Sequence, residues 1–208
     1  MNRIQINSVA EPFRSPELAR KAVGAISRAE AMGLLDGIEA IDRLDLTSFQ
    51  DIGAKISEAG IARNAMAELS GTAANQTERL RSILHELDQA LLDSPLPEYE
   101  WPALEGILGA ELLGRLTGVS VSSLRRYRSA RRRTPDAVAA RLHFLALIVG
   151  DLAGAYNDLG IRRWFERKRS LLGGQAPIEI LTGAWAPEDP GPSRIRELAQ
   201  SLSYSPAT

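Results

Sequence analysis

The segment from Thr134 to Gly160 constrains the fold of this chain more than any other feature of its sequence. Thr134 and Pro135 are typical of a helix start, as N-cap and first helical position, and Gly160 is typical of a helix end. Between them, residues 142–149 have the sequence LHFLALIV and are apolar on nearly all sides. Such a helix is stable only when it is buried all round, so we predict that it forms the spine of a helical core.

Three other segments place apolar residues at helical spacing, and patterns typical of strands are scarce. Ser15 and Pro16 predict the start of the first of these helices. Residues 47–69 form the second, which its two glycines weaken. Residues 75–93 form the third, with one stripe of leucine and isoleucine. The fold class predicted for the whole chain is therefore all-α.

Residues 93–102 have the sequence DSPLPEYEWP and carry three prolines, which predicts a linker. The charge balance changes sign at the same place. Residues 1–100 hold 10 Lys and Arg against 16 Asp and Glu, residues 101–169 hold 13 against 6, and residues 170–208 hold 2 against 4. We therefore place a domain boundary near residue 98 and expect the middle third to meet an anion and the acidic flanks to meet protein.

The composition excludes several classes of protein. None of the 208 residues is cysteine, which excludes disulfides, thiolate catalysis and cysteine-bound metals. The first residues lack the apolar run of a secretion signal, and no stretch has the roughly 18 apolar residues of a membrane span. We therefore expect a cytoplasmic protein with no membrane contact.

Motifs of catalysis are also missing. His85 and His143 are the only histidines, without metal-ligand spacing; His85 falls in an amphipathic helical pattern and His143 in the apolar spine. No nucleophile or phosphate-loop motif occurs, since the glycines at 173 and 174 are not followed by Gly-Lys-Ser/Thr. We expect both histidines to be structural, and the chain to have no enzymatic activity, no cofactor and no metal.

The stretch LLGRLTGVSVSSLRRYRS, residues 112–129, matches a helix-turn-helix. Gly114 would let the two helices approach closely, Gly118 would form the turn, and Ser120 would cap the second helix. The residues expected to lock the helices together are apolar: Leu113, Leu116, Val119, Leu124 and Tyr127. The alternative is a helical hairpin that never contacts DNA.

Residues 121–128 would lie in the major groove of double-stranded operator DNA. Arginine forms paired hydrogen bonds with guanine, and serine bonds to bases or phosphates, whereas arginines at the far end of the helix would meet phosphates alone. The predicted DNA-binding residues are Ser120, Ser122, Ser123, Arg125, Arg126, Arg128, Arg131, Arg132 and Arg133. For any single arginine, the alternative is a solvated surface position.

Two resemblances to known families start from these motifs. The stretch GVSVSSLRRY is similar to the reading helix of MerR-type regulators, but the wing of that family does not follow. Residues 164–181 have the sequence WFERKRSLLGGQAPIEIL and resemble the C-terminal toxin-binding domain of the Xre/MbcA/ParS antitoxins. The elements that carry the second resemblance are Trp164, Leu172, Gly173, Gly174, Pro177 and Leu181.

The second resemblance covers about residues 104–202, because in that family a helix-turn-helix precedes the toxin-binding part. It implies residues 99–159 as the DNA-binding region and 160–208 as a small helical toxin-binding domain. Residues 1–98 lie outside the resemblance, and we expect them to be a helical region of unknown role or of dimerisation. The function implied is that of a type II antitoxin. It would act as a homodimer within a larger complex, occlude the active site of a RES-domain NAD-degrading or ADP-ribosylating toxin, and repress its own operon.

Trp185 follows that signature in a loop rich in proline and glycine, which departs from the usual ending of the family. We expect it to be exposed there and to anchor the toxin, because exposed tryptophans are frequent anchors of interfaces. Trp164 has two interpretations, a toxin contact or a buried core residue. The alternative function is a stand-alone helix-turn-helix regulator whose C-terminal region senses a ligand or joins subunits.

Overall fold

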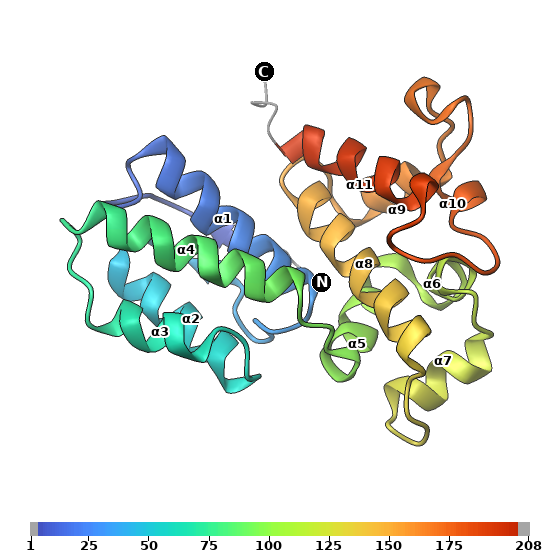
Figure 1. Ribbon diagram of the computed structural model, residues 1–208, viewed down its shortest axis with the longest axis horizontal. Helices are drawn as coiled ribbons and strands as arrows, with labels where there is room; N and C mark the ends of the chain where they lie inside the picture. The colour runs from blue at the N-terminus through green and yellow to red at the C-terminus, as the bar shows by residue number, and fades with distance from the viewer. Residues whose placement is uncertain (1–3, 204–208) are drawn as a thin grey trace. The chain divides into compact units, whose positions relative to one another are not determined.

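A computed structural model of the chain describes residues 4–203 (Figure 1). Within that range it contains eleven α-helices, one 3-10 helix and two strands of two residues each, so the predicted all-α fold class is confirmed. The described residues form two compact units. We call residues 4–30 and 34–94 the N-terminal unit, and residues 31–33 and 95–203 the C-terminal unit.

Two long helices, α1 (Pro16–Ala31) and α4 (Thr77–Leu92), belong to the N-terminal unit. Helix α1 begins at Pro16 as predicted, and the carbonyl of Ser15 accepts the first hydrogen bond of the helix. The predicted stripe of α4 is buried and consists of Leu80, Ile83, Leu84, Leu87 and Leu91. Each such side chain contributes about 1.5–3 kcal/mol of hydrophobic free energy on burial.

The helix expected over residues 47–69 is two helices, α2 (Leu46–Glu58) and α3 (Arg63–Ser70). The chain breaks at Gly60, whose φ of +92° belongs to the left-handed region that favours glycine. The other glycine, Gly53, lies inside α2 and serves packing instead. A Cβ there would lie 2.5 Å from Sδ of Met66 on α3, so a larger residue would require the Met66 side chain to move.

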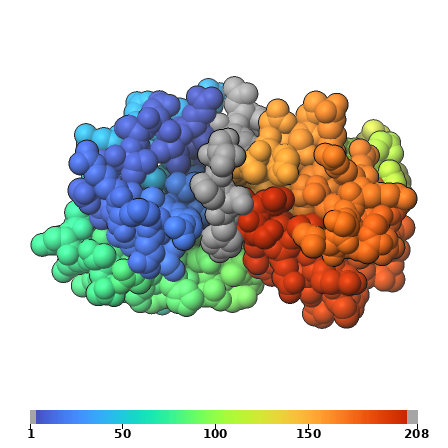
Figure 2. Space-filling view, turned by 90° about the horizontal axis from the view of Figure 1, so that it is seen from above, coloured from blue at the N-terminus to red at the C-terminus, as the bar shows by residue number. Residues whose placement is uncertain are grey.

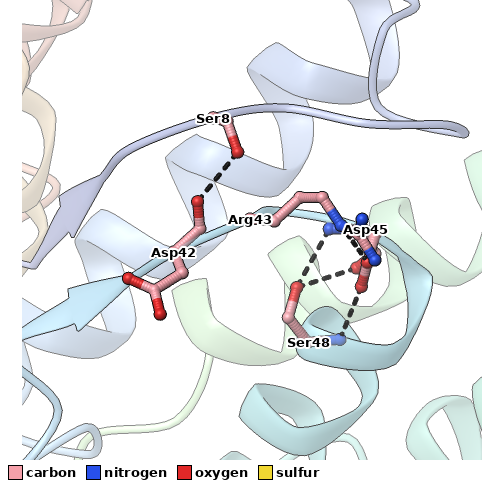
Figure 3. A network of polar contacts seen from close by, with 5 residues as sticks. All are labelled: Ser8, Asp42, Arg43, Asp45 and Ser48. Atoms are coloured by element: carbon pink, nitrogen blue, oxygen red, sulfur yellow. Dashed lines mark hydrogen bonds and ion pairs between the residues drawn. The ribbon is translucent and has the colours of Figure 1, made fainter.

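The strands β1 (Gln5–Ile6) and β2 (Ala40–Ile41) pair in parallel, and Asp45, a few residues after β2, caps α2. In Figure 3, Asp45 Oδ1 accepts from the backbone N–H of Ser48 at 3.0 Å, and Ser48 Oγ accepts from the N–H of Asp45 at 2.9 Å. The hydrogen bond from the backbone N–H of Ser48, together with the Arg43 guanidinium at 2.8 Å, lowers the pKa of Asp45. The reciprocal bonds fix the start of α2.

The expected linker over residues 93–102 is much shorter in the structure. The two units divide between Ser94 and Pro95, and helix α5 (Pro97–Leu108) begins two residues later. Pro97 occupies the first helical position, where its missing N–H costs nothing, whereas Pro102 lies inside the helix. Burial of Trp101 offsets the roughly 3 kcal/mol that an internal proline costs. The prediction of a linker over residues 97–102 was therefore wrong.

The predicted spine of the core is α8 (Asp136–Ala153), in which every residue from 142 to 152 is buried. It is shorter than predicted, because the chain turns at Gly154 and Asn157 caps the next helix, α9 (Asp158–Glu166). Thr134 is not the N-cap of α8, because the helix begins at Asp136 and Pro135 occupies the N-cap position. The hydroxyl of Thr134 instead accepts the indole N–H of Trp101 at 3.0 Å. Pro135, with extended backbone, precedes the first turn.

The C-terminal unit is completed by a 3-10 helix (Ser170–Leu172), α10 (Pro177–Ile180) and α11 (Pro190–Ser203). Helix α11 packs along α8. In Figure 2 the red atoms of α11 lie beside the orange atoms of residues earlier in the C-terminal unit. Residues 99–159 and the described part of 160–208, expected to be two domains, thus contribute to one compact unit, and residues 204–208 lie outside the described residues. Among the described residues no single helix has the length and hydropathy needed to cross a membrane. Only α8 and α9 taken together have that length and hydropathy, and the two helices are bent by 118° relative to each other.

Candidate nucleic-acid interface

The predicted helix-turn-helix consists of α6 (Ala110–Thr117) and α7 (Val121–Arg128) in the C-terminal unit (Figure 1). Gly118 ends α6 in the left-handed conformation, with φ +74° and ψ +24°, and its N–H donates to the carbonyl of Gly114. The N–H of Val119 donates to the same carbonyl at 3.0 Å. The turn therefore has the geometry that a glycine C-cap provides.

Gly114 has the role that its position predicts. A Cβ at this residue would lie 2.9 Å from the carbonyl oxygen of Val119, which is backbone and cannot move aside cheaply. The chain that enters α7 thus passes directly over the surface of α6. Glycine at 114 permits this approach, and no larger residue fits without displacing the turn.

The apolar lock between the helices is largely as predicted. Leu113, Leu116 and Leu124 are fully buried and Tyr127 is 8% exposed, whereas Val119 is only half-buried. The ring of Tyr127 stacks on Trp101 of α5, with ring centroids 5.8 Å apart and an interplanar angle of 20°. Helix α7 is therefore held from two sides, by α6 and by α5.

The three predicted serines lie at the N-terminus of α7. Ser120 is the N-cap, and its Oγ accepts the backbone N–H of Ser123 at 3.2 Å. The hydroxyls of Ser122 and Ser123 lie 3.0 and 3.1 Å from Ser120 Oγ. Ser120 and Ser122 are exposed and Ser123 is half-buried. Hydroxyls and free N–H groups at a helix start are suited to a phosphate oxygen.

All six predicted arginines are exposed, while the neighbouring apolar residues of α7 face inward. Arg125 and Arg126 lie on the outer face of α7, and Arg126 Nε bonds only to the carbonyl of Ser122 on its own helix, at 3.3 Å. Arg128 differs, because its Nη1 lies 2.7 Å from Oε2 of Glu105. Two of the outward arginines of α7 are therefore available for base edges, and the third is paired.

Arg131, Arg132 and Arg133 lie beyond the end of α7, not at its last turn as expected. Ala130, with φ +54°, turns the chain back, and the N–H of Arg132 donates to the carbonyl of Arg126. Arg132 lies over the ring of Tyr127 at 5.7 Å, and Arg133 pairs with the exposed Asp136 at 3.4 Å. These arginines extend the positive surface next to α7.

The C-terminal signature is mostly buried. Trp164 is 1% exposed and Leu181 fully buried, and Leu172 and Pro177 are buried as well. Gly173 and Gly174 are exposed and form a turn, with φ values of +67° and +82°. Of the two interpretations of Trp164, the structure supports the core residue. The signature thus builds the fold of this region, and its exposed part is the turn.

Arg169 is also part of this region, although no sequence pattern indicates its position. Its guanidinium carbon lies 4.6 Å from the ring centroid of Trp164, and burial lowers the pKa of the arginine. Its carbonyl accepts the N–H of Gly174 at 2.9 Å, which closes the turn.

The expectation that Trp185 is exposed was wrong. Its side chain is 6% exposed and packs edge to face against Phe144 of α8, with ring centroids 5.2 Å apart. The loop is rich in proline and glycine, but the large apolar surface of the indole is buried against the spine of the core. Trp185 therefore cannot anchor a partner directly in this conformation.

His143, expected to be structural, is buried on α8, with Nδ1 2.6 Å from Oε1 of Glu100. Burial raises the pKa of Glu100, and the hydrogen bond with His143 opposes that shift. Within residues 4–203 no group of three or more acidic, histidine or cysteine side chains is arranged to hold a metal.

The arrangement around α7 is that of a rigid helix which presents cations on one side and is held by core packing on the other. Chemically, such a surface is suited to a polyanion with a groove of helix width. Comparison with known proteins adds no family to this description: no protein-family model, no curated protein and no solved structure matches the chain.

Proposed function

We propose that this chain binds double-stranded DNA by placing α7 in the major groove. The observation that carries the proposal is the division of α7 into two faces, with Leu124 and Tyr127 buried and Arg125 and Arg126 exposed. The major groove is about 12 Å wide and admits a helix of this kind. Arg125, Arg126 and Ser122 would contact base edges, because they project from the middle of the exposed face.

Binding to phosphates would come from the residues around that face. Arg131, Arg132 and Arg133 add affinity without sequence preference, since any duplex offers the same phosphates. Ser120 and Ser123 lie at the start of α7, where hydroxyls and N–H groups favour an anion. Arg128 would also contact a phosphate when DNA displaces Glu105 from its guanidinium.

Fluorescence anisotropy tests this proposal with a labelled duplex taken from directly upstream of the coding sequence and a scrambled duplex of equal length. The chain should prefer the upstream duplex, and the double variant Arg125→Ala/Arg126→Ala should lose most of that preference. If the chain binds as a homodimer, footprinting should show half-sites about 34 Å apart or a multiple of that spacing. An unchanged preference in the double variant would reject the role of α7.

We further propose that the chain is an antitoxin that represses its own operon. The support is the order of a basic helix-turn-helix followed by the Trp, Leu-Gly-Gly and Pro signature. The cognate toxin would be a RES-domain enzyme that degrades NAD or transfers ADP-ribose, and its active site would be occluded. Because the signature tryptophan and leucines are buried, the contact would come from the turn at Gly173 and Gly174 and from Leu171, whose side chain is 74% exposed.

Co-expression with the product of the adjacent gene tests this second proposal. The chain should rescue growth and co-purify with that product, and Leu171→Asp should abolish both effects. Leu159→Asp is the matched control, because Leu159 is also exposed, at 54%, but lies in the first turn of α9, whereas Leu171 lies in the 3-10 helix. If Leu159→Asp is as damaging as Leu171→Asp, the toxin contact does not lie at Leu171. If the unaltered chain neither rescues nor co-purifies, the antitoxin proposal fails.

One observation favours the alternative, a stand-alone transcriptional regulator. Trp164, Leu172, Pro177 and Leu181 are buried in the same compact unit as α6 and α7. The signature would then serve the stability of the DNA-binding unit, and the C-terminal region would sense a ligand or join subunits. Under this alternative the chain binds the upstream duplex but does not interact with the adjacent gene product.

A further inference from the structure

The last turn of α6 has carbonyl groups that the helix itself cannot pair, as every helix C-terminus has. Two of them are paired from outside the helix-turn-helix. The indole Nε1 of Trp185 donates to the carbonyl of Leu116 at 3.0 Å, and Nη1 of Arg141 donates to the carbonyl of Thr117 at 3.2 Å. The turn that precedes α7 is thus tied to α8 and to the loop after α10.

The two donors also hold each other. Arg141 Nε donates to the backbone carbonyl of Trp185 at 2.7 Å, and the guanidinium carbon lies 5.6 Å from the indole ring centroid. The edge-to-face contact with Phe144 fixes the other side of the indole. One planar guanidinium therefore spans two carbonyls from distant parts of the chain, which only the fork of arginine can do in this geometry.

Gly118 shows how closely this pair meets the turn. A Cβ at Gly118 would lie 3.1 Å from Nη1 of Arg141 and 3.1 Å from the carbonyl oxygen of Gly183. The turn therefore lies close to Arg141 and to the backbone at Gly183. A change in the position of Arg141 or Trp185 would be transmitted to the backbone that aims α7.

We infer that Arg141 and Trp185 are positioning residues for base recognition, acting through the carbonyls of Leu116 and Thr117. This inference rests on the proposed DNA binding. Hydrogen bonds to base edges demand a helix placed to within a fraction of an ångström, whereas attraction to phosphates tolerates small shifts. Loosening the clamp formed by Arg141 and Trp185 should therefore lower sequence discrimination more than overall affinity.

The first test compares Arg141→Met with Arg169→Met. Arg169 makes a similar pair with a different tryptophan, with its guanidinium over the ring of Trp164 and Nη2 3.5 Å from that residue's carbonyl. Both variants remove one positive charge, so their effects on non-specific attraction are matched. The measured quantity is the ratio of affinities for the upstream duplex and the scrambled duplex. We expect Arg141→Met to lower that ratio about tenfold, and Arg169→Met to change it less than about twofold.

Two milder variants separate the effect of the clamp on discrimination from the effects of charge and of misfolding. Trp185→Phe keeps an aromatic ring against Phe144 but removes the indole N–H, and should lower the same ratio by about fivefold. Arg141→Lys keeps the charge but lacks the planar fork, so it should resemble Arg141→Met. Full discrimination by Arg141→Lys would show that charge alone matters and would overturn the inference.

Amide hydrogen exchange in the absence of DNA distinguishes failure of this inference from failure of the proposed function. Amides of residues 114–120 should exchange about tenfold faster in Arg141→Met and Trp185→Phe than in the unaltered chain, and Arg169→Met should leave them unchanged. If the unaltered chain shows no preference for the upstream duplex, the proposed function fails and exchange still tests the clamp. If preference and exchange both stay normal in the clamp variants, the inference is wrong.

Discussion

Nη1 of Arg128 on α7 lies 2.7 Å from Oε2 of Glu105 on α5. Glu105 is the more buried partner, with a side chain 19% exposed against 53% for Arg128. A carboxylate in this position competes with DNA phosphates for one of the arginines of the proposed interface. It also helps to hold α7 on α5, although a partly exposed pair of this kind contributes only up to about 1 kcal/mol.

Glu105→Gln should strengthen binding to any duplex, because it releases Arg128 for a phosphate. One additional phosphate contact steepens the dependence of log K on log salt by about 0.9. Anisotropy titrations of a scrambled duplex at several salt concentrations measure this slope. Glu111→Gln is the matched control, since Glu111 is an exposed acidic residue on α6 and its loss changes the net charge equally. An equal steepening in both variants would contradict the specific role of the pair.

The arginines of α7 should contribute to sequence discrimination, and those beyond α7 should contribute to overall affinity for DNA. Arg125→Ala and Arg126→Ala should each cost about 1–3 kcal/mol of discrimination between the upstream and scrambled duplexes. Alanine at Arg131, Arg132 or Arg133 should weaken binding to both duplexes equally and lower the salt slope by about 1 each. Titrations of the single variants against both duplexes separate the two classes. A loss of discrimination at Arg131 to Arg133 would place base contacts beyond α7.

The helix-turn-helix could be predicted because its determinants are local. The turn needs Gly118, the cap needs Ser120 and the lock needs Leu124, and all of them lie within one stretch of 18 residues. The periodicity of residues 75–93 likewise identified α4 and its buried stripe. In these segments the spacing of apolar residues and the capping signals favour the same structure, so no tertiary contact had to be known.

The parts that could not be predicted depend on distant contacts. Trp185 is buried because it reaches Leu116, 69 positions earlier in the chain, and nothing near Trp185 in the sequence indicates this. The prolines of residues 93–102 predicted a linker, yet Pro97 starts α5 and Trp101 buries its ring on Tyr127. Arg141 has only the pattern of a charged residue at the edge of an apolar helix, which is typical of many solvated positions.

Gly114→Ala should destabilise the C-terminal unit. The added methyl would lie 2.9 Å from the carbonyl oxygen of Val119, and overpacking of this kind costs roughly 1–3 kcal/mol. Gly106→Ala is the control, because Gly106 lies in α5 of the same unit and has nothing within 4 Å of an added Cβ. It should stabilise the unit by about 0.5–1 kcal/mol. Urea unfolding measures both. Because the helix propensity of alanine offsets part of the overpacking cost at residue 114, the contradicting result is a Gly114→Ala variant stabilised as much as Gly106→Ala.

Trp101 and Trp164, two of the three buried tryptophans of the C-terminal unit, should respond differently to phenylalanine. Nε1 of Trp101 donates to Thr134 Oγ1 at 3.0 Å, whereas Nε1 of Trp164 is buried and has no hydrogen-bond partner among the described residues. Trp101→Phe should therefore reduce the free energy of unfolding by about 1 kcal/mol more than Trp164→Phe. Adding Thr134→Val to Trp101→Phe should recover part of that difference, and equal losses in the two single variants would contradict it.

Glu100 should make the stability of the chain depend on pH. Its carboxyl is fully buried with Oε1 2.6 Å from Nδ1 of His143, and burial raises its pKa above the ordinary value of 4.5. The folded chain therefore holds this proton to higher pH than the unfolded chain, so the contribution to stability is complete below pH 4.5 and is lost as pH rises through the raised pKa.

Glu100→Gln cannot titrate, so the stability of the unaltered chain relative to this variant should fall as pH rises from 4.5. Urea unfolding over a pH series measures that difference. Glu111→Gln, at an exposed residue of α6 in the same unit, is the control and should keep the pH dependence of the unaltered chain. A difference that stays constant or grows with pH would show that the carboxyl is ionised in the folded chain at no net cost.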